Sequence, residues 1–246
     1  MLCGDDTKLI EAHIIPYWAY RYINRKDKKV APLLLLGPKH NKKSAKGLYD
    51  TEILCKNCDG FLGIFDSYGK AIFVNRPIEA MTLDNEVIGY LMKNVDYKKI
   101  QIFILSVLWR ASISKKEELK ATFLGPYEIK IRNLLFNLTK NMNVENELSN
   151  YPVIVTKFGD GKFPDLVDRS IMLPYTKQRI EQVLFASIFL PRGFKISIKT
   201  DKRLMPPSLT TNLTKNGDLI ILKINDFEKS ADFRAMQKVL HKDTVK

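Results

Sequence analysis

Three short runs of the sequence contain residue types that bind metals or move protons. They are Cys3-Gly4, then Glu11-Ala12-His13-Ile14-Ile15-Pro16, and then Leu54-Cys55-Lys56-Asn57-Cys58-Asp59. A Cys-x-x-Cys turn presents two thiolates to one metal ion, and zinc prefers four sulfur or nitrogen ligands in a tetrahedral arrangement. The same spacing occurs in redox motifs, but those follow a strand in a thioredoxin-like context that this sequence lacks. We therefore favour a zinc site containing Cys55 and Cys58 over redox chemistry.

In this order, the runs resemble the core of the HNH (ββα-metal, treble-clef zinc) endonucleases, whose zinc-bearing members place one Cys-x-x-Cys before the first strand and another after the second. They are closer still to an uncharacterised bacterial branch with Cys-Gly, His-Ile-Ile-Pro and Leu-Cys-x-x-Cys-Asp/Glu. That branch continues with Leu-Trp-Arg-Ala-Ser and Leu-Gly-Pro-Tyr-Glu-x-Lys-Ile-Arg, which here occupy residues 108–112 and 124–132. The closer likeness covers about residues 3–135, and the nuclease likeness covers roughly residues 3–73. The resemblance implies a metal-dependent endonuclease acting on DNA, in a bacterial defence (antiphage) or mobile-element setting.

The resemblance also implies roles for individual residues. His13 matches the general base, a neutral imidazole that takes a proton from the water attacking a phosphodiester. Asp50 and Asp59 match positions that hold a catalytic Mg²⁺ or Mn²⁺, which would stabilise the charge that develops on the phosphate. Cys3 matches the second cysteine of the first knuckle, so that Cys3, Cys55 and Cys58 would hold a structural Zn²⁺.

Several departures leave alternatives open. Ala12 stands where these nucleases commonly place a metal-binding Asp or His. The partner cysteine of the first knuckle would fall before the first residue, so the zinc is completed upstream, or by His13, His40 or Asp59, or stays three-coordinate. Asp50 also suits a turn, Asp59 also suits a helix cap, and His13 also suits a buried structural position.

The basic charge is concentrated in one segment. The chain has 40 Lys and Arg against 27 Asp and Glu, a net charge of +13, and a field of that sign attracts nucleic acid. Residues 21–46 contain nine basic residues and one acidic residue, so they supply +8 of that charge. The segment is either a solvated loop or a phosphate-contacting surface. On the second reading the DNA contacts are Arg21, Arg25, Lys26, Lys28, Lys29, Lys42 and Lys43.

Composition excludes several classes of protein. With 246 residues, 45% hydrophobic content and 27% charged content, the chain suits one large or two small folded domains rather than a disordered chain. Its longest apolar runs, residues 102–109 and 183–190, are too short to span a bilayer, and no secretory signal is evident at its start. Three cysteines are too few for a disulfide framework. We therefore expect a cytoplasmic protein without membrane contact.

Local patterns predict an α+β fold. Residues 1–75 would form the HNH-like zinc unit, residues 76–150 a helical region, and residues 151–246 a β-rich α+β region that is a candidate for contact with a protein partner. Helices are expected over residues 16–23, 59–73, 126–140 and 227–241, and over residues 91–112 with a break near residues 94–97. Strands are expected over residues 152–158, 183–190, 194–200 and 219–224, with Arg192-Gly193 as a hairpin turn. Residues 183–190 could equally end a helix that begins near Thr176.

Aromatic and basic residues in apolar surroundings favour packing roles. Trp18 and Tyr22 are four residues apart, a helical spacing that indicates core more often than stacking on bases. Trp109 and Arg110 lie in an apolar run, which predicts packing for the first and a buried ion pair for the second. Two hypotheses result: a metal-dependent HNH-type endonuclease, or a non-catalytic, zinc-stabilised nucleic-acid-binding or adaptor protein with a degenerate site.

Overall fold

The computed structural model describes residues 1–4, 8–25, 33–35, 42–44, 47–159, 167–168, 171–209, 217–225, 227–230 and 232–234. The α-helices are α1 (Tyr17–Arg25), α2 (Lys56–Lys70, continued by a π-helical turn over Ala71–Asn75), α3 (Tyr97–Ile113), α4 (Tyr127–Thr139) and α5 (Glu145–Leu148). The strands are β1 (Ala12–His13), β2 (Leu33–Leu35), β3 (Lys42–Ser44), β4 (Tyr49–Asp50), β5 (Glu79–Leu83), β6 (Glu86–Met92), β7 (Val153–Phe158), β8 (Met172–Ile180), β9 (Val183–Leu190), β10 (Phe194–Lys199) and β11 (Leu219–Ile224).

The described strands form one seven-stranded sheet and two small ones. The large sheet has the order β5-β6-β11-β7-β10-β9-β8, and the small ones pair β1 with β4 and β2 with β3. Neighbouring strands are antiparallel except β11 and β7, which are parallel. Residues 79–92 therefore contribute to the same sheet as the strands that follow residue 153.

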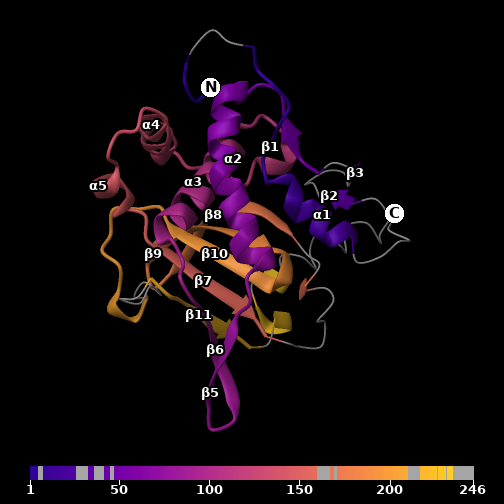
Figure 1. Cartoon of the computed structure of the whole chain (residues 1–246), viewed down its shortest axis with the longest axis vertical. Coiled ribbons are helices and arrows are strands. Elements are labelled where there is room, and N and C mark those ends of the chain that lie inside the picture. The colour runs from indigo at the N-terminus through magenta and orange to yellow at the C-terminus, as the bar shows by residue number, and fades with distance from the viewer. Residues whose placement is uncertain are drawn as a thin grey trace.

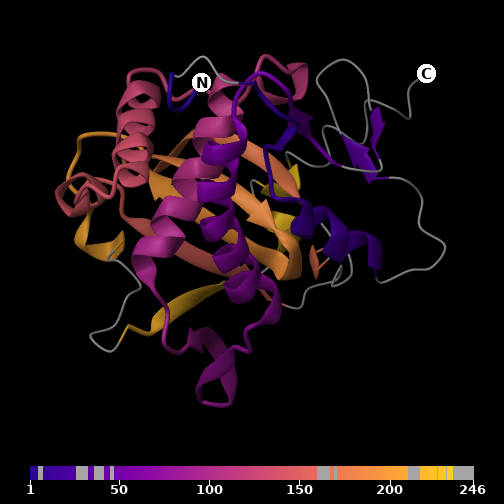
Figure 2. The same ribbon diagram turned by 45° about the horizontal axis from the view of Figure 1, so that its top comes forward.

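Helices cover one face of this sheet. Figures 1 and 2 show α2 and α3 side by side across it, with α4 beside α3. Most of α3 is buried, because it packs on the sheet with one side and on α2 and α4 with the others. One hydrophobic core joins Leu2 and Ile14 to Leu108, Ile196 and Ile221, so it includes residues from all three predicted segments. The three-part division of the chain stays a prediction.

The predicted α+β class and the β-rich C-terminal half are confirmed. The helices expected over residues 16–23, 59–73 and 126–140 correspond to α1, α2 and α4. Residues 183–190 form strand β9 rather than the end of a helix. The Arg192-Gly193 turn joins β9 to β10, with φ values of 64° and 73° at these two residues.

The helix expected over residues 91–112 forms after the predicted break near residues 94–97, but the residues before the break are not helical. Leu91 and Met92 end strand β6 instead, where Met92 pairs with Leu219 of β11. The helix starts at Tyr97 because the Asp96 carboxylate accepts a hydrogen bond from the Lys99 backbone N–H at 3.1 Å and so caps it. Of the helix expected over residues 227–241, residues 232–234 are helical, and most of its later part lies outside the described residues.

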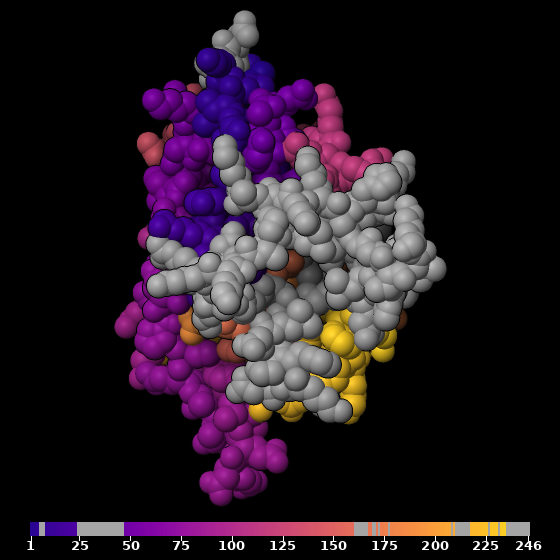
Figure 3. Space-filling model, turned by 90° about the vertical axis from the view of Figure 1, so that its right-hand side faces the viewer, coloured from indigo at the N-terminus to yellow at the C-terminus, as the bar shows by residue number. Residues whose placement is uncertain are grey.

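The β5–β6 hairpin projects from one end of the molecule (Figures 1 and 3). Its outer residues Leu83 and Ile88 are exposed.

Among the described helices, none combines the length and the apolar composition that crossing a bilayer requires.

Two glycines in α2 offer a direct test of how closely α2 approaches α3. A Cβ at Gly69 would lie 2.9 Å from the Phe103 ring, whereas a Cβ at Gly63 would meet nothing within 4 Å. The Phe103 ring cannot move aside easily, because it is buried between the Trp18 and Phe73 rings. We expect Gly69→Ala to lower the free energy of unfolding by about 1–3 kcal/mol through overpacking. Gly63→Ala is expected to raise it by about 0.5–1 kcal/mol, because alanine is the better helix former.

Urea denaturation of the two variants measures both values. Equal effects of the two substitutions would contradict the close approach of α2 and α3 at Gly69.

Candidate functional site

Two paired segments followed by a helix build the candidate site. In the β1–β4 pair, Ala12 lies opposite Asp50 and His13 opposite Tyr49. The pairing continues toward the cysteines through a bridge between Leu9 and Cys55. Helix α2 starts directly after Cys55. In the chain, α1, β2 and β3 lie between the two paired segments.

The three cysteines come together at the start of α2. All three are thiols, and their sulfur atoms lie within 4.8 Å of one another. The Sγ atoms of Cys3 and Cys55 are 3.8 Å apart. A tetrahedral ion with Zn–S bonds of about 2.3 Å places two ligand sulfurs about 3.8 Å apart. The cluster therefore fits a metal such as zinc.

The first residues of the chain are held in place by packing and by helix α4. Leu2 is buried in the main core. The Arg132 guanidinium of α4 donates a hydrogen bond to the Met1 carbonyl oxygen at 2.9 Å. Both contacts are made by the two residues that precede Cys3, and Figure 1 shows this end of the chain beside the start of α2.

Burial affects the chemistry of the thiols. It raises the pKa of the Cys58 thiol to about 12, and the neighbouring Cys55 and Cys3 thiols act in the same direction. A metal binds the thiolate form, so an ion entering this cluster must displace protons.

His13 lies at the end of β1 between two aromatic rings. Its ring centroid is 5.4 Å from that of Tyr17 and 6.3 Å from that of Tyr49. The His13 side chain is half-buried, while Tyr17 is exposed. An imidazole at this position borders solvent.

A buried ion pair holds the backbone beneath His13. The Arg110 guanidinium, 1% exposed, donates two hydrogen bonds to the Asp66 carboxylate at 2.8 and 2.9 Å, and a third to the His13 carbonyl oxygen at 3.0 Å. It also contacts Ser106 of its own helix. The buried ion pair predicted for Arg110 is thus confirmed, and Asp66 is its partner. Sequence reasoning missed Asp66 because no local pattern distinguishes it from a solvated helix residue.

The aromatic residues named from the sequence have packing roles. Trp109 is buried. The Trp18 indole N–H donates to the Asp66 carbonyl oxygen at 2.9 Å, and its ring lies 6.2 Å from that of Phe103. The Tyr22 hydroxyl donates to the Asp168 carboxylate at 3.1 Å.

Asp59 lies in the first turn of α2 and shares the electrostatic environment of His13. Burial raises the pKa of the Asp59 carboxyl, and the charge of Asp66 acts in the same direction, whereas Arg110 and His13 lower it. Cys55, rather than Asp59, occupies the N-cap position of α2. Asp59 is therefore a half-buried carboxyl in the first turn of α2 whose protonation is influenced by the charge of His13.

Asp50 does not join this constellation. Side chains alternate along a strand and paired residues share a face, so the register puts Asp50 on the face of Ala12, opposite to the face of His13 and Tyr49. Its carboxylate accepts hydrogen bonds from the Glu52 backbone N–H at 2.9 Å and from the Ser114 hydroxyl. The structure thus favours the turn role for Asp50. Ala12, on the same face, is buried and has no side-chain atom that could bind a metal.

The basic segment is described only in part. Arg21 is exposed on α1. The side chain of Arg25 lies outside the described residues, as do the side chains of Lys42 and Lys43 in β3 and the whole of Lys26, Lys28 and Lys29. The role of these seven residues in DNA contact stays a prediction, as does that of His40 in metal binding.

One further basic residue lies close to the site, and no pattern in the sequence predicted it. The Lys116 ammonium lies 5.6 Å from the centroid of the Tyr49 ring, although Lys116 follows α3, far along the chain. Only the folded chain brings it next to the β1–β4 pair.

The Arg110–Asp66 pair can be tested against an exposed pair. Asp66→Ala leaves a buried guanidinium without its carboxylate, and we expect it to lower the free energy of unfolding by about 3–5 kcal/mol. Lys115→Ala breaks the pair of Lys115 and Glu52, whose side chains are 87% and 64% exposed, and is expected to change stability little. Urea denaturation of both variants provides the measurement. A loss no larger in Asp66→Ala than in Lys115→Ala would contradict the anchoring role of the pair.

No protein-family model, no curated protein and no solved structure matches this chain. What the site does must therefore be argued from its own residues.

Proposed function

We propose that residues 1–75 form an HNH-type endonuclease unit that hydrolyses DNA phosphodiesters with the help of a divalent metal. The observation that carries the proposal is the three-cysteine cluster at the start of α2, with His13 on the adjoining paired segments and Asp59 in the first turn of the helix, where the charge of His13 acts on the Asp59 carboxyl. An imidazole that borders solvent in the electrostatic range of a carboxyl suits proton transfer at a phosphate.

In this proposal His13 is the general base and takes the proton from the attacking water. Arg110 is a positioning residue, because its bond to the His13 carbonyl oxygen fixes the backbone that carries the imidazole. Asp59 is the ligand to Mg²⁺ or Mn²⁺, and such an ion supplies charge stabilisation at the phosphate when it is bound. Asp50 is assigned to the turn rather than to the metal.

The three-cysteine cluster is assigned to structural zinc. Cys3, Cys55 and Cys58 would tie the first residues of the chain to the start of α2, immediately before Asp59. Structural zinc sites contribute directly to folding free energy, because the unfolded chain lacks the assembled ligand set.

DNA is the proposed substrate because of the charge of the chain. The net charge of +13, with +8 of it in residues 21–46, favours a polyanion, and that segment lies between the two paired segments of the site.

Ala12 and Asp50 favour a second candidate, a non-catalytic nucleic-acid-binding or adaptor protein. Ala12 has no ligand atom, and both oxygens of the Asp50 carboxylate already accept hydrogen bonds. Asp59 would then have to bind a catalytic metal with fewer protein ligands than an intact HNH site provides. On this reading the zinc cluster and the basic segment bind nucleic acid without cleaving it.

Cleavage of plasmid DNA decides between the two candidates. We expect the full chain to nick or cut DNA with Mg²⁺ or Mn²⁺ and not with EDTA. His13→Ala is expected to lower the rate by about 100-fold or more, the usual contribution of a general base. Asp59→Ala is expected to remove the response to added metal. His241→Ala is the matched control, because no part of the proposal uses His241.

Full activity of a parallel preparation of His13→Ala would refute the assignment of the base. Salt-sensitive DNA binding without cleavage under any divalent metal would establish the second candidate instead. Failure to bind DNA at low salt would exclude both.

The zinc assignment is tested by metal content and stability together. We expect about one zinc per chain, and expect a chelator to lower the melting temperature by about 10 °C, because it removes a ligand bound only by the folded state. Cys58→Ser should lose the zinc and no longer respond to the chelator. A Cys58→Ser variant that retains the full zinc content would overturn this assignment.

A further inference from the structure

A second pocket lies away from the His13 site. It has a volume of about 480 Å³ and lies between helix α4, the segment that follows α5, and the end of β10. Figures 1 and 2 show α4 and α5 on the opposite side of α2 and α3 from α1 and β1. The residues that matter for its chemistry are Tyr127, Lys130, Leu134, Tyr151, Lys199 and Lys202.

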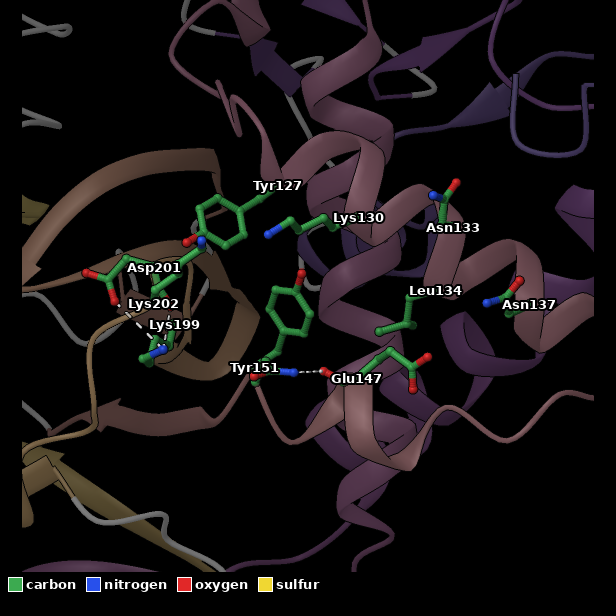
Figure 4. Close-up of a pocket in the computed structure, with 11 residues that line it drawn as sticks. Tyr127, Lys130, Asn133, Leu134, Asn137, Glu147, Tyr151, Lys199, Asp201 and Lys202 are labelled. Atoms are coloured by element: carbon green, nitrogen blue, oxygen red, sulfur yellow. Dashed lines mark hydrogen bonds and ion pairs between the residues drawn. The ribbon is translucent and has the colours of Figure 1, made fainter.

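Tyr151 supplies a hydrogen-bond donor that faces this pocket. The residue is 5% exposed, and in Figure 4 its ring lines the pocket with the hydroxyl pointing toward Lys130. Burial raises the pKa of Tyr151 to about 12, so the hydroxyl keeps its proton at neutral pH. Within the part of the chain that the structure describes, no hydrogen-bond partner is found for this hydroxyl, although the Tyr151 backbone N–H and carbonyl are both bonded. A hydroxyl that faces the pocket in this way can donate a hydrogen bond to a ligand that carries an acceptor.

The charges on the pocket wall leave an excess of positive charge. The Asp201 carboxylate accepts hydrogen bonds from the backbone N–H groups of Leu184 in β9 and Arg203 in its own loop, at 2.9 and 3.1 Å. The Lys199 ammonium, 3.7 Å from Asp201, offsets its charge. Lys130 and Lys202 have no ion-pair partner among the described residues. Both point toward the end of the pocket that contains Tyr127 and Tyr151, whereas the Glu147 carboxylate points away from it (Figure 4).

Flat apolar surface lies next to these cationic groups. The rings of Tyr127 and Tyr151 and the side chain of Leu134 line the same pocket, and the Lys130 ammonium is 5.4 Å from the Tyr127 ring centroid. Aromatic side chains of this kind stack on nucleobases irrespective of base identity. The amides of Asn133 and Asn137, further along α4, offer both donors and acceptors.

We propose that this pocket binds a nucleoside phosphate. The phosphate would contact the ammonium groups of Lys130 and Lys202 and the Tyr151 hydroxyl, and the base would pack on the tyrosine rings. A cavity of 480 Å³ lies within the range of about 300–1,000 Å³ typical of small-molecule pockets. The proposal does not depend on the nuclease assignment, because none of its residues belongs to the His13 site.

Calorimetric titration of the full chain tests the proposal with three probes: adenosine monophosphate, adenosine and inorganic phosphate. We expect the nucleotide to bind with a dissociation constant below about 1 mM, and the other two to bind at least about tenfold more weakly, because each lacks one half of the ligand. His13→Ala is expected to bind the nucleotide as the wild type does, which separates this result from the fate of the nuclease proposal.

Three variants locate the binding site. Lys130→Gln and Lys202→Gln are each expected to weaken nucleotide binding about tenfold, and Tyr151→Phe by about three- to tenfold. Lys140→Gln, on the same helix as Lys130 but outside the pocket, is the matched control and should bind within twofold of the wild type. Lys202 is exposed, so its substitution tests the site without disturbing the fold.

Absence of binding at nucleotide concentrations up to about 10 mM, which is far above the expected dissociation constant, would overturn the proposal. Inorganic phosphate binding as tightly as the nucleotide would overturn the role of the tyrosine rings. Nucleotide binding that is unchanged in Lys130→Gln, Lys202→Gln and Tyr151→Phe would place the ligand elsewhere and overturn the assignment of this pocket.

Discussion

The Arg110 guanidinium joins three parts of the chain that are far apart in sequence. It lies on α3, is 1% exposed, binds the Asp66 carboxylate of α2 through two hydrogen bonds, and holds the carbonyl oxygen of His13 in β1. A charge this deeply buried must keep its partners, because an unpaired guanidinium in the interior is costly. The pair therefore fixes α2 against α3 and the β1 backbone against both, and the geometry of the candidate site depends on it.

Helix α2 organises the candidate site along its length. The cysteine cluster lies at its start, Asp59 in its first turn, and Asp66 two turns later on the same face. This spacing explains why Asp59 experiences the charges of both Arg110 and Asp66. A single helix thus connects the proposed zinc site to the proposed catalytic residues. Further along it, the close approach of Gly69 to Phe103 packs the same helix against α3.

The two proposed ligand sites lie on opposite sides of the helical layer and differ in construction. The His13 site is built from two short paired segments and the start of α2, next to an inserted basic segment. The second pocket is built from the polar face of α4, the residues after α5 and the end of β10. Phosphate is the common chemistry of both proposed ligands, in keeping with the net charge of +13. The first site would act on a polymer, whereas the second would bind a small molecule.

Local patterns in the sequence determined the elements and several of their roles. Residue spacing, turn residues and the burial of apolar runs act over a few residues. They account for the Cys55 and Cys58 turn, helix α4, the strands β7, β9, β10 and β11, and the ion pair of Arg110. Tertiary structure alone decided the rest. Three features join segments that are distant in the chain. They are the approach of Cys3 to Cys55, the pairing of Leu91 and Met92 with strand β11, and the second pocket. The β1–β4 register places Asp50 on the opposite face of the strand pair from His13. Side chains alternate along a strand, so the pairing partner rather than the local sequence decides which residues share a face.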